Sequence, residues 1–208
     1  MTVTLPHSTA SDVRRASAHD AAALGRVLAE AFYDDPVGIW FVPDDEIRLH
    51  RLDRFFRLVC AERLALPHGE VRTTDDLAGA ALWMPPGSTE TTALQDLMLL
   101  PSVVRASGRG IVRVLRGLAA MDAVHPHEPH WYLPQLGVLP SRQGQGIGSA
   151  LMRPVLERAD ADGMPAYLEA TTPRSRALYE RHGFRVLDIM FMPAGGPPMW
   201  RMWRDPQG

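Results

Sequence analysis

Lysine and asparagine are both absent from this chain, and Cys60 is its single cysteine. One cysteine excludes an internal disulfide and a zinc site built from cysteines. The absence of lysine excludes a P-loop, because the motif G-x-x-x-x-G-K-[ST] needs a lysine to reach the outer phosphates. The formal net charge is only −2, so there is no electrostatic case for a protein that binds nucleic acid.

Long apolar runs are also missing. No run reaches the roughly 18 residues of a membrane-spanning helix. The N-terminus also lacks the positively charged segment followed by an apolar segment that is typical of a signal peptide. We therefore expect a cytoplasmic protein that does not bind membranes. With 46% hydrophobic and 22% charged residues, the composition is that of one soluble globular domain. We expect this domain at residues 12–208, after a disordered tail at residues 1–11.

The spacing of apolar residues predicts a mixed order of strands and helices. In the N-terminal half we expect a strand at 12–17, helices at 18–32 and 45–66, a hairpin of strands at 70–74 and 77–85, and mostly helix at 92–121. In the C-terminal half we expect strands at 130–138, 166–171, 184–191 and 199–204, with helices at 146–162 and 173–182. This order predicts an α/β fold with a mixed, centrally parallel sheet and helices on both faces.

A glycine-rich turn lies between the strand at 130–138 and the helix that follows it. Gly144, Gly146 and Gly148 occupy alternate positions, and the helical pattern begins at Ile147. The first turn of a helix has unpaired N–H groups and a dipole that favours negative charge. Glycine lets the backbone approach that charge closely. The turn therefore predicts a site for a phosphorylated ligand, although an ordinary strand–helix turn explains the glycines equally well.

Two patterns compete for this turn once a P-loop is excluded. A dinucleotide-binding G-x-G-x-x-G turn fails because Ser149 stands where its third glycine should be, and only about 40 residues follow the candidate ribose ligand Glu169. The alternative [QR]-x-x-G-x-[GA] is matched by Gln143, Gly146 and Gly148. Further along, residues 177–184 read ALYERHGF and match A-L-Y-E-[RK]-x-G-F.

With both motifs in this order, the chain resembles the GCN5-related N-acetyltransferases (GNAT). Within that family the segments HWYL, LEAT and YERHGF look like the branch that contains puromycin N-acetyltransferase. The resemblance is close over residues 129–204, the expected coenzyme A half, and holds only in outline before them. It implies a GNAT fold with a twisted mixed sheet of about six to seven strands, splayed between the fourth and fifth. Pro134 suits a bulge or splayed edge there, or a simple edge kink.

The resemblance also implies a binding site for acetyl-CoA. In this family the loop amides hold the pyrophosphate, and main-chain atoms of the fourth strand pair with pantetheine. The corresponding residues here are Leu136, Gly137, Val138, Gln143, Gly144, Gln145, Gly146, Ile147, Gly148 and Ser149. Thr172 and Ser175 stand where the family often has an asparagine, and either hydroxyl could cap the helix or reach coenzyme A.

The implied reaction moves an acetyl group from acetyl-CoA to an amine. Tyr179 matches the family tyrosine beside the sulfur, and its usual pKa of about 10 keeps it protonated to serve as the acid. An aromatic side chain at helical spacing is also typical of a core. Glu169 could accept the proton of the amine, or could pair with Arg174 or Arg176. Neither motif contains a cysteine, so the amine is expected to attack directly.

Acidic and aromatic residues of the N-terminal half suit a cationic amine as acceptor. We expect this pocket to include Tyr33, Asp34, Asp35, Trp40 and Trp83, although the two tryptophans could equally be core residues. His125, His127 and His130 resemble a metal cluster, but prolines separate them and they lack helical spacing, so no metal is expected.

The sequence therefore predicts an N-acetyltransferase that acts on a small molecule, because the helices of residues 45–121 would close a pocket. Two alternatives stay open. One is a non-catalytic sensor that binds acyl-CoA, and the other is an enzyme that acetylates proteins or peptides through an open groove. The sequence leaves the oligomeric state open between a monomer and a homodimer.

Overall fold

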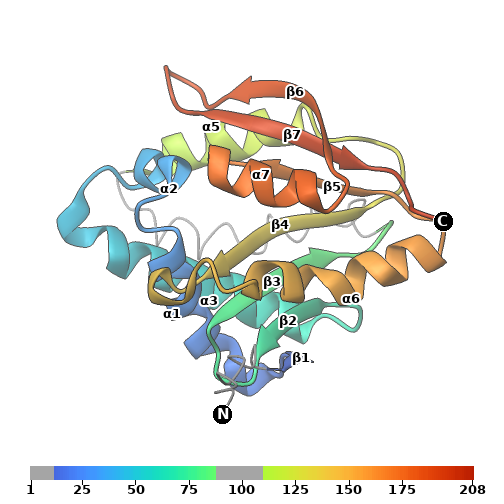
Figure 1. The fold of residues 1–208 in the computed structure, drawn as a ribbon. Coiled ribbons are helices and arrows are strands. Elements are labelled where there is room, and N and C mark those ends of the chain that lie inside the picture. The colour runs from blue at the N-terminus through green and yellow to red at the C-terminus, as the bar shows by residue number, and fades with distance from the viewer. Residues whose placement is uncertain (1–11, 88–109) are drawn as a thin grey trace, which may run out of the picture.

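Seven strands form one mixed sheet in the computed structural model, which describes residues 12–87 and 110–208 (Figure 1). They are β1 (Val13–Arg15), β2 (Glu70–Thr74), β3 (Gly79–Met84), β4 (Trp131–Val138), β5 (Ala166–Ala170), β6 (Arg185–Phe191) and β7 (Pro198–Arg204). Their order across the sheet is β1-β2-β3-β4-β5-β7-β6. The pair β4–β5 is parallel and the other neighbouring pairs are antiparallel. The predicted mixed sheet, parallel at its centre, is confirmed.

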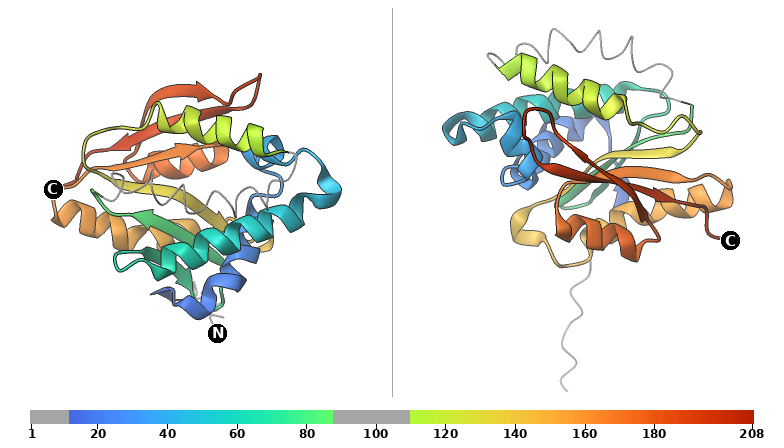
Figure 2. Two further views of the ribbon diagram at one scale, coloured as in Figure 1. Left: turned by 180° about the vertical axis from the view of Figure 1, so that it is seen from behind. Right: turned by 90° about the horizontal axis from the view of Figure 1, so that it is seen from above.

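Helices cover both faces of this sheet, as the view from above shows (Figure 2). One face carries α1 (Ala21–Ala31), α2 (Pro36–Phe41), α3 (Asp45–Ala65) and α5 (Ile111–Asp122), and the other carries α6 (Ile147–Ala161) and α7 (Pro173–Arg181). Two short 3-10 helices, Ala18–Asp20 and Pro140–Arg142, precede α1 and α6. The expectations for the tail at 1–11 and for residues 92–109 of the segment at 92–121 lie outside the described residues. Within the described ranges, no helix has the length and hydropathy needed to cross a bilayer.

The strand β3 lies between two apolar cores because both of its faces are covered. Successive side chains of a strand point to opposite faces. Ala80 and Leu82 pack with α1 and α3, where Leu28 and Phe56 are buried. Ala81 and Trp83 face the other way and join a core that includes α6 and β5. Burial on both faces explains why this strand reads as a continuous apolar run.

The short helix α2 was not expected from the sequence, which indicated a break at Pro36. The break is instead a helix start, because proline is well suited to the first helical position. Asp35 is the N-cap, and its Oδ1 accepts hydrogen bonds from the backbone N–H groups of Val37 at 2.8 Å and Gly38 at 3.3 Å. Pro36 therefore begins a new helix a few residues after α1 ends at Ala31.

The parallel strands β4 and β5 pair over only two positions and then separate. The pairs are Trp131 with Ala166 and Tyr132 with Tyr167. Immediately afterwards β4 bulges against β3, whose register shifts between Leu82 and Met84. The bulge falls at residues 133–134, where Pro134 has no N–H to donate to a neighbouring strand. The expected bulge and the expected gap between the fourth and fifth strands are both present.

Gly137 allows α1 to lie directly on β4. A Cβ at this position would lie 2.8 Å from Leu28 Cδ2 and 2.9 Å from Ala31 Cβ, and the latter is fixed to the backbone. We expect Gly137→Ala to lower the free energy of unfolding by about 1–3 kcal/mol, as overpacking does. Chemical denaturation of both proteins measures this difference, and an unchanged free energy would show that α1 is not pressed against β4 at this point.

Candidate active site

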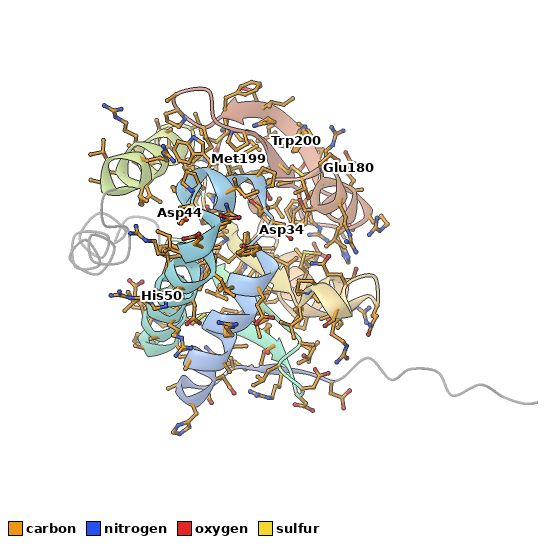
Figure 3. All side chains as sticks on the ribbon, turned by 90° about the vertical axis from the view of Figure 1, so that its left-hand side faces the viewer. Asp34, Asp44, His50, Glu180, Met199 and Trp200 are labelled. Atoms are coloured by element: carbon orange, nitrogen blue, oxygen red, sulfur yellow. The ribbon has the colours of Figure 1, made fainter. Side chains whose placement is uncertain are left out.

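A cavity of about 830 Å³ lies at the gap between β4 and β5. Its wall is formed by β4 and the glycine turn, by the end of β5 and by α7, and on the other side by residues of α1, α2, α3 and α5. Asp34 and Met199, both labelled in Figure 3, belong to this lining. One space is therefore bounded by the turn expected to hold an anion and by the elements expected to hold an acceptor.

The glycine turn presents free backbone donors to this cavity. Gly144 and Gly146 have φ values of +81° and +80°, a left-handed conformation that favours glycine. Gly146 is the N-cap of α6, and the first N–H bonded within the helix is that of Ala150, to the carbonyl of Gly146 at 3.0 Å. The N–H groups of residues 147–149 have no backbone partner in the described part of the chain. Unpaired donors of this kind at a helix N-terminus suit an anion.

Side chains fix the shape of the turn. Gln143 Nε2 donates to the carbonyl of Val138 at 3.1 Å, and Arg174 donates to Gln143 Oε1 at 2.7 Å. Arg142 donates to Asp76 at 2.7 Å and to Oε1 of Gln145 at 3.2 Å. Arg142 and Arg174 line the cavity and bring positive charge to it, whereas Gln145 does not line it.

Thr172 and Ser175 form the start of α7. The hydroxyl of Thr172 accepts from the N–H of Ser175 at 3.1 Å, and the hydroxyl of Ser175 accepts from the N–H of Thr172 at 3.1 Å. This reciprocal arrangement is a capping box. Both residues also line the cavity, so the structure places the two hydroxyls at the helix cap and within the candidate site.

Tyr179 on α7 is 7% exposed and lines the cavity. Its ring packs against Phe184 with centroids 6.0 Å apart, while its hydroxyl donates to no residue that the structure describes. Burial raises the pKa of this hydroxyl above its usual value, and the nearby carboxylates of Asp35 and Glu169 raise it further. The sequence allowed Tyr179 to be a core residue or a proton donor. In the structure its side chain is buried in the core and also borders the cavity as a protonated group.

Glu169 on β5 is held at the same cavity. Its Oε2 accepts a hydrogen bond from the hydroxyl of Tyr132 at 2.9 Å. Burial raises the pKa of its carboxyl to about 7, against the opposing effects of the Tyr167 and Tyr132 hydroxyls and the charge of Arg201. A carboxyl with this pKa can accept and release a proton near neutral pH.

The two arginines considered as partners of Glu169 lie elsewhere. Arg174 is bonded to Gln143 at the glycine turn, as described above. Arg176 forms an i,i+4 ion pair with Glu180 at 2.7 Å on the outer side of α7. Glu169 is thus not a strand-end carboxylate neutralised by either arginine.

Three of the residues expected in the acceptor pocket do not line the cavity, and these expectations are corrected. Trp83 is fully buried, with its ring 6.5 Å from that of Trp131, because it lies on the core face of β3. Trp40 packs in a separate apolar cluster beside Phe41. Tyr33 donates its hydroxyl to the carbonyl of Asp45 at 3.4 Å and turns away from the site. Asp34 does line the cavity, as expected.

Apolar residues that sequence reasoning did not assign to the site form this side of the cavity. They are Phe32, Phe41, Phe55, Phe56, Leu118 and Met121. Phe55 and Phe56 were recognisable on the apolar side of the helix at 45–66, but periodicity does not separate a residue that packs in the core from one that borders a cavity. Only the placement of the helices around the gap makes that distinction.

Asp35 is a second acidic group in the lining on this side. Besides capping α2, it accepts through Oδ2 a hydrogen bond from the hydroxyl of Thr171, which follows β5. Burial raises the pKa of its carboxyl above the usual value, against the opposing effects of the hydrogen bonds from Thr171, Val37 and Gly38. A bond between residues 35 and 171 joins the two sides of the cavity.

No group of three or more His, Cys, Asp and Glu side chains within residues 12–87 and 110–208 could hold a metal ion. The rings of His125 and His130 instead lie 5.0 Å apart in an aromatic cluster with Tyr132 and Tyr167.

Comparison with known proteins gives these features a context. The model of the acetyltransferase (GNAT) family matches residues 29–184. An N-acetyltransferase of Schizosaccharomyces pombe is 27% identical over 209 residues, which cover 93% of this chain and 83% of that protein. The N-acetyltransferase PaiA of Thermoplasma acidophilum, solved in complex with coenzyme A, is 12% identical with a TM-score of 0.61, covering 95% of this chain and 99% of its own.

A histone acetyltransferase HPA2 and related acetyltransferase from Corynebacterium glutamicum is also similar in structure. It is 29% identical with a TM-score of 0.73, and the match covers 95% of this chain and 97% of that one. The family model spans more than half of the chain and includes both the glycine turn and the tyrosine helix. The chain therefore belongs to the GNAT family of acetyltransferases.

Proposed function

We propose that this acetyltransferase transfers the acetyl group of acetyl-CoA to the amine of a small molecule. The observation that carries the proposal is that Tyr179 and Glu169 line one cavity, which also reaches the free N–H groups of the glycine turn. A proton donor, a proton acceptor and an anion site are thus brought to the same space. These are the groups that acyl transfer from a phosphorylated thioester to an amine requires.

The residues at the gap fit coenzyme A. The edge of β4 that faces away from β3 has no pairing with β5 beyond Tyr132, so its main-chain groups at 136–138 could pair with the amides of pantetheine. The N–H groups of residues 147–149 would receive the pyrophosphate, with Arg142 and Arg174 beside them.

The proposed chemistry uses two side chains in turn. Glu169 in its ionised form accepts a proton from the attacking amine, which forms the new C–N bond. Collapse of the tetrahedral intermediate breaks the C–S bond, and Tyr179 donates its proton to the leaving thiolate. The donor must stay protonated until that step, and the raised pKa of Tyr179 ensures this. Below a pH of about 7 the Glu169 carboxyl becomes protonated and loses its ability to accept.

The acceptor side supports a small amine with an apolar body. Phe32, Phe41 and Phe55 provide an apolar wall, and Asp34 and Asp35 provide negative charge for an ammonium group. An enzyme for proteins or peptides is the second candidate, because the name of the similar Corynebacterium protein includes a histone acetyltransferase.

The narrower expectations remain proposals. A relationship to the branch of puromycin N-acetyltransferase rests on the short segments HWYL, LEAT and YERHGF. A cytoplasmic location, the lack of interaction with nucleic acid or membranes, and a monomer or homodimer as the working form also stay predictions.

A pair of glycine variants tests the coenzyme A site. Gly146 and Gly163 both have positive φ, +80° and +63°, and a Cβ at either would meet nothing within 4 Å. Substitution by alanine should therefore cost each protein a similar conformational strain, about 1–2 kcal/mol. We expect Gly146→Ala to weaken coenzyme A binding about tenfold in calorimetry, because the new Cβ stands where the pyrophosphate approaches. Gly163→Ala, at the far end of α6, should bind as the wild type does; equal affinities in all three proteins would place the anion elsewhere.

Release of free thiol from acetyl-CoA, measured with a panel of small amines, antibiotics and peptides, tests the proposed reaction. Turnover on a small amine should fall about tenfold or more in Tyr179→Phe, since the ring packing is kept and the proton donor is lost. Turnover on peptides alone would favour the protein-modifying alternative. Tight binding of coenzyme A without turnover on any acceptor would favour the sensor.

Asp35→Asn tests the recognition of a cationic acceptor. Asparagine caps a helix as well as aspartate does, so α2 should persist while the negative charge is removed. We expect KM for a cationic amine to rise roughly tenfold, with KM for acetyl-CoA unchanged, because a charge-assisted contact is lost. Asp44→Asn is the matched control: Asp44 caps α3 through the N–H of Glu46 at 3.1 Å and lies outside the cavity lining (Figure 3). Equal effects of both variants would contradict a role of Asp35 in recognition.

A further inference from the structure

We propose that Tyr132 is a positioning residue, whose hydroxyl bonds Oε2 of Glu169 and holds the plane of this carboxylate for its role as the base. The inference rests on the proposed function, in which Glu169 is the base. It assigns a role to a residue of β4 that neither of the two family motifs contains.

Tyr132 occupies the point at which the two parallel strands separate. It forms the last pair of β4 with β5, opposite Tyr167, and the bulge at residues 133–134 follows directly. Glu169 lies two residues beyond Tyr167 on β5 and so on the same face of the strand. The Tyr132 hydroxyl reaches it at 2.9 Å, from one strand to the other. A side-chain hydrogen bond thus continues across the gap where backbone pairing has ended.

The two oxygens of the carboxylate have different surroundings. Oε2 accepts from Tyr132, whereas Oε1 is buried and has no hydrogen-bond partner among the described residues. The terminal torsion of a glutamate is broad, so an unrestrained carboxylate would turn freely. A hydrogen bond to one oxygen fixes the plane of the whole group. The bond from Tyr132 to Oε2 therefore sets the orientation of the carboxylate.

Tyr132 is itself held in place by its neighbours. Its ring packs edge-on against His125, with centroids 4.7 Å apart, and lies 5.7 Å from the ring of Tyr167. Burial and the adjacent Glu169 raise the pKa of the Tyr132 hydroxyl well above its usual value, so it remains a donor. Burial lowers the pKa of His125 to about 4, so this imidazole is neutral at physiological pH.

Charged groups from the other elements packed around Glu169 complete its environment. Arg201 on β7 lies opposite Glu169 in register and donates through Nε to the Tyr167 hydroxyl at 3.4 Å. Tyr179 on α7 faces the same cavity from the other side, together with Asp35 at the start of α2. The positive charge of Arg63 on α3 lowers the pKa of the Tyr132 hydroxyl, against the effects of burial and of Glu169. The Tyr132 hydroxyl bonds Oε2 at 2.9 Å, and the neighbouring Tyr167 hydroxyl also lowers the pKa of Glu169.

Tyr132→Phe tests the inference because it keeps the ring contacts and removes only the hydroxyl. A hydroxyl that donates to a carboxylate stabilises its ionised form, so its loss raises the pKa of Glu169. The acidic limb of the kcat profile, expected near pH 7 in the wild type, should move to higher pH by about 0.5–1 unit. On the plateau kcat should fall about tenfold with KM for acetyl-CoA unchanged. Tyr33→Phe, which removes a hydroxyl outside the cavity, should leave both quantities unchanged.

Glu169→Gln separates this inference from the proposed function. If Glu169 is the base, this variant abolishes the acidic limb, and adding Tyr132→Phe to it causes no further loss. If the limb disappears in Glu169→Gln while Tyr132→Phe keeps the wild-type midpoint and kcat, the positioning role is overturned and the base assignment stands. A lower thermal midpoint of Tyr132→Phe with an unchanged pH profile overturns it in the same way. If Glu169→Gln keeps both activity and limb, the base assignment itself fails.

Discussion

The separation of β4 from β5 after two residue pairs is the constraint on which the site depends. Parallel strands that continued side by side would satisfy each other's backbone groups and leave no room between them. The bulge at residues 133–134 turns β4 away along β3, while β5 continues along β7. An unpaired strand edge and a cavity result together. The cavity is therefore a direct product of the sheet's register and not a space left between independent layers.

Burial at this gap adjusts the two proposed proton-transfer groups in useful directions. It raises the pKa of Glu169 to about 7, and it raises the pKa of Tyr179 further above neutrality. Each shift has desolvation as its largest cause, and the two carboxylates at the cavity add to the effect on the tyrosine. One environment thus provides a base that can be ionised near pH 7 and an acid that keeps its proton. Such a pair of differently perturbed groups is what acid–base catalysis at neutral pH needs.

The two sides of the cavity differ in how their residues are brought together. The side formed by the glycine turn and α7 presents backbone donors and a tyrosine, features that depend on short motifs. The other side is made of Phe32, Phe41, Phe55 and their neighbours, which come from separate helices. Its shape follows from how those helices pack and is a property of this chain.

The sequence by itself determined the elements whose signals are local. The glycine turn and most strand and helix bounds were predicted within a few residues, because neighbouring residues fix backbone conformation there. Tertiary structure alone decided which aromatic side chains border the cavity. Trp83 is a core residue because both faces of β3 are covered, and periodicity within one strand does not reveal what covers it. The same is true of Tyr132 and Glu169, which are 37 residues apart and meet only because the strands pair and then part.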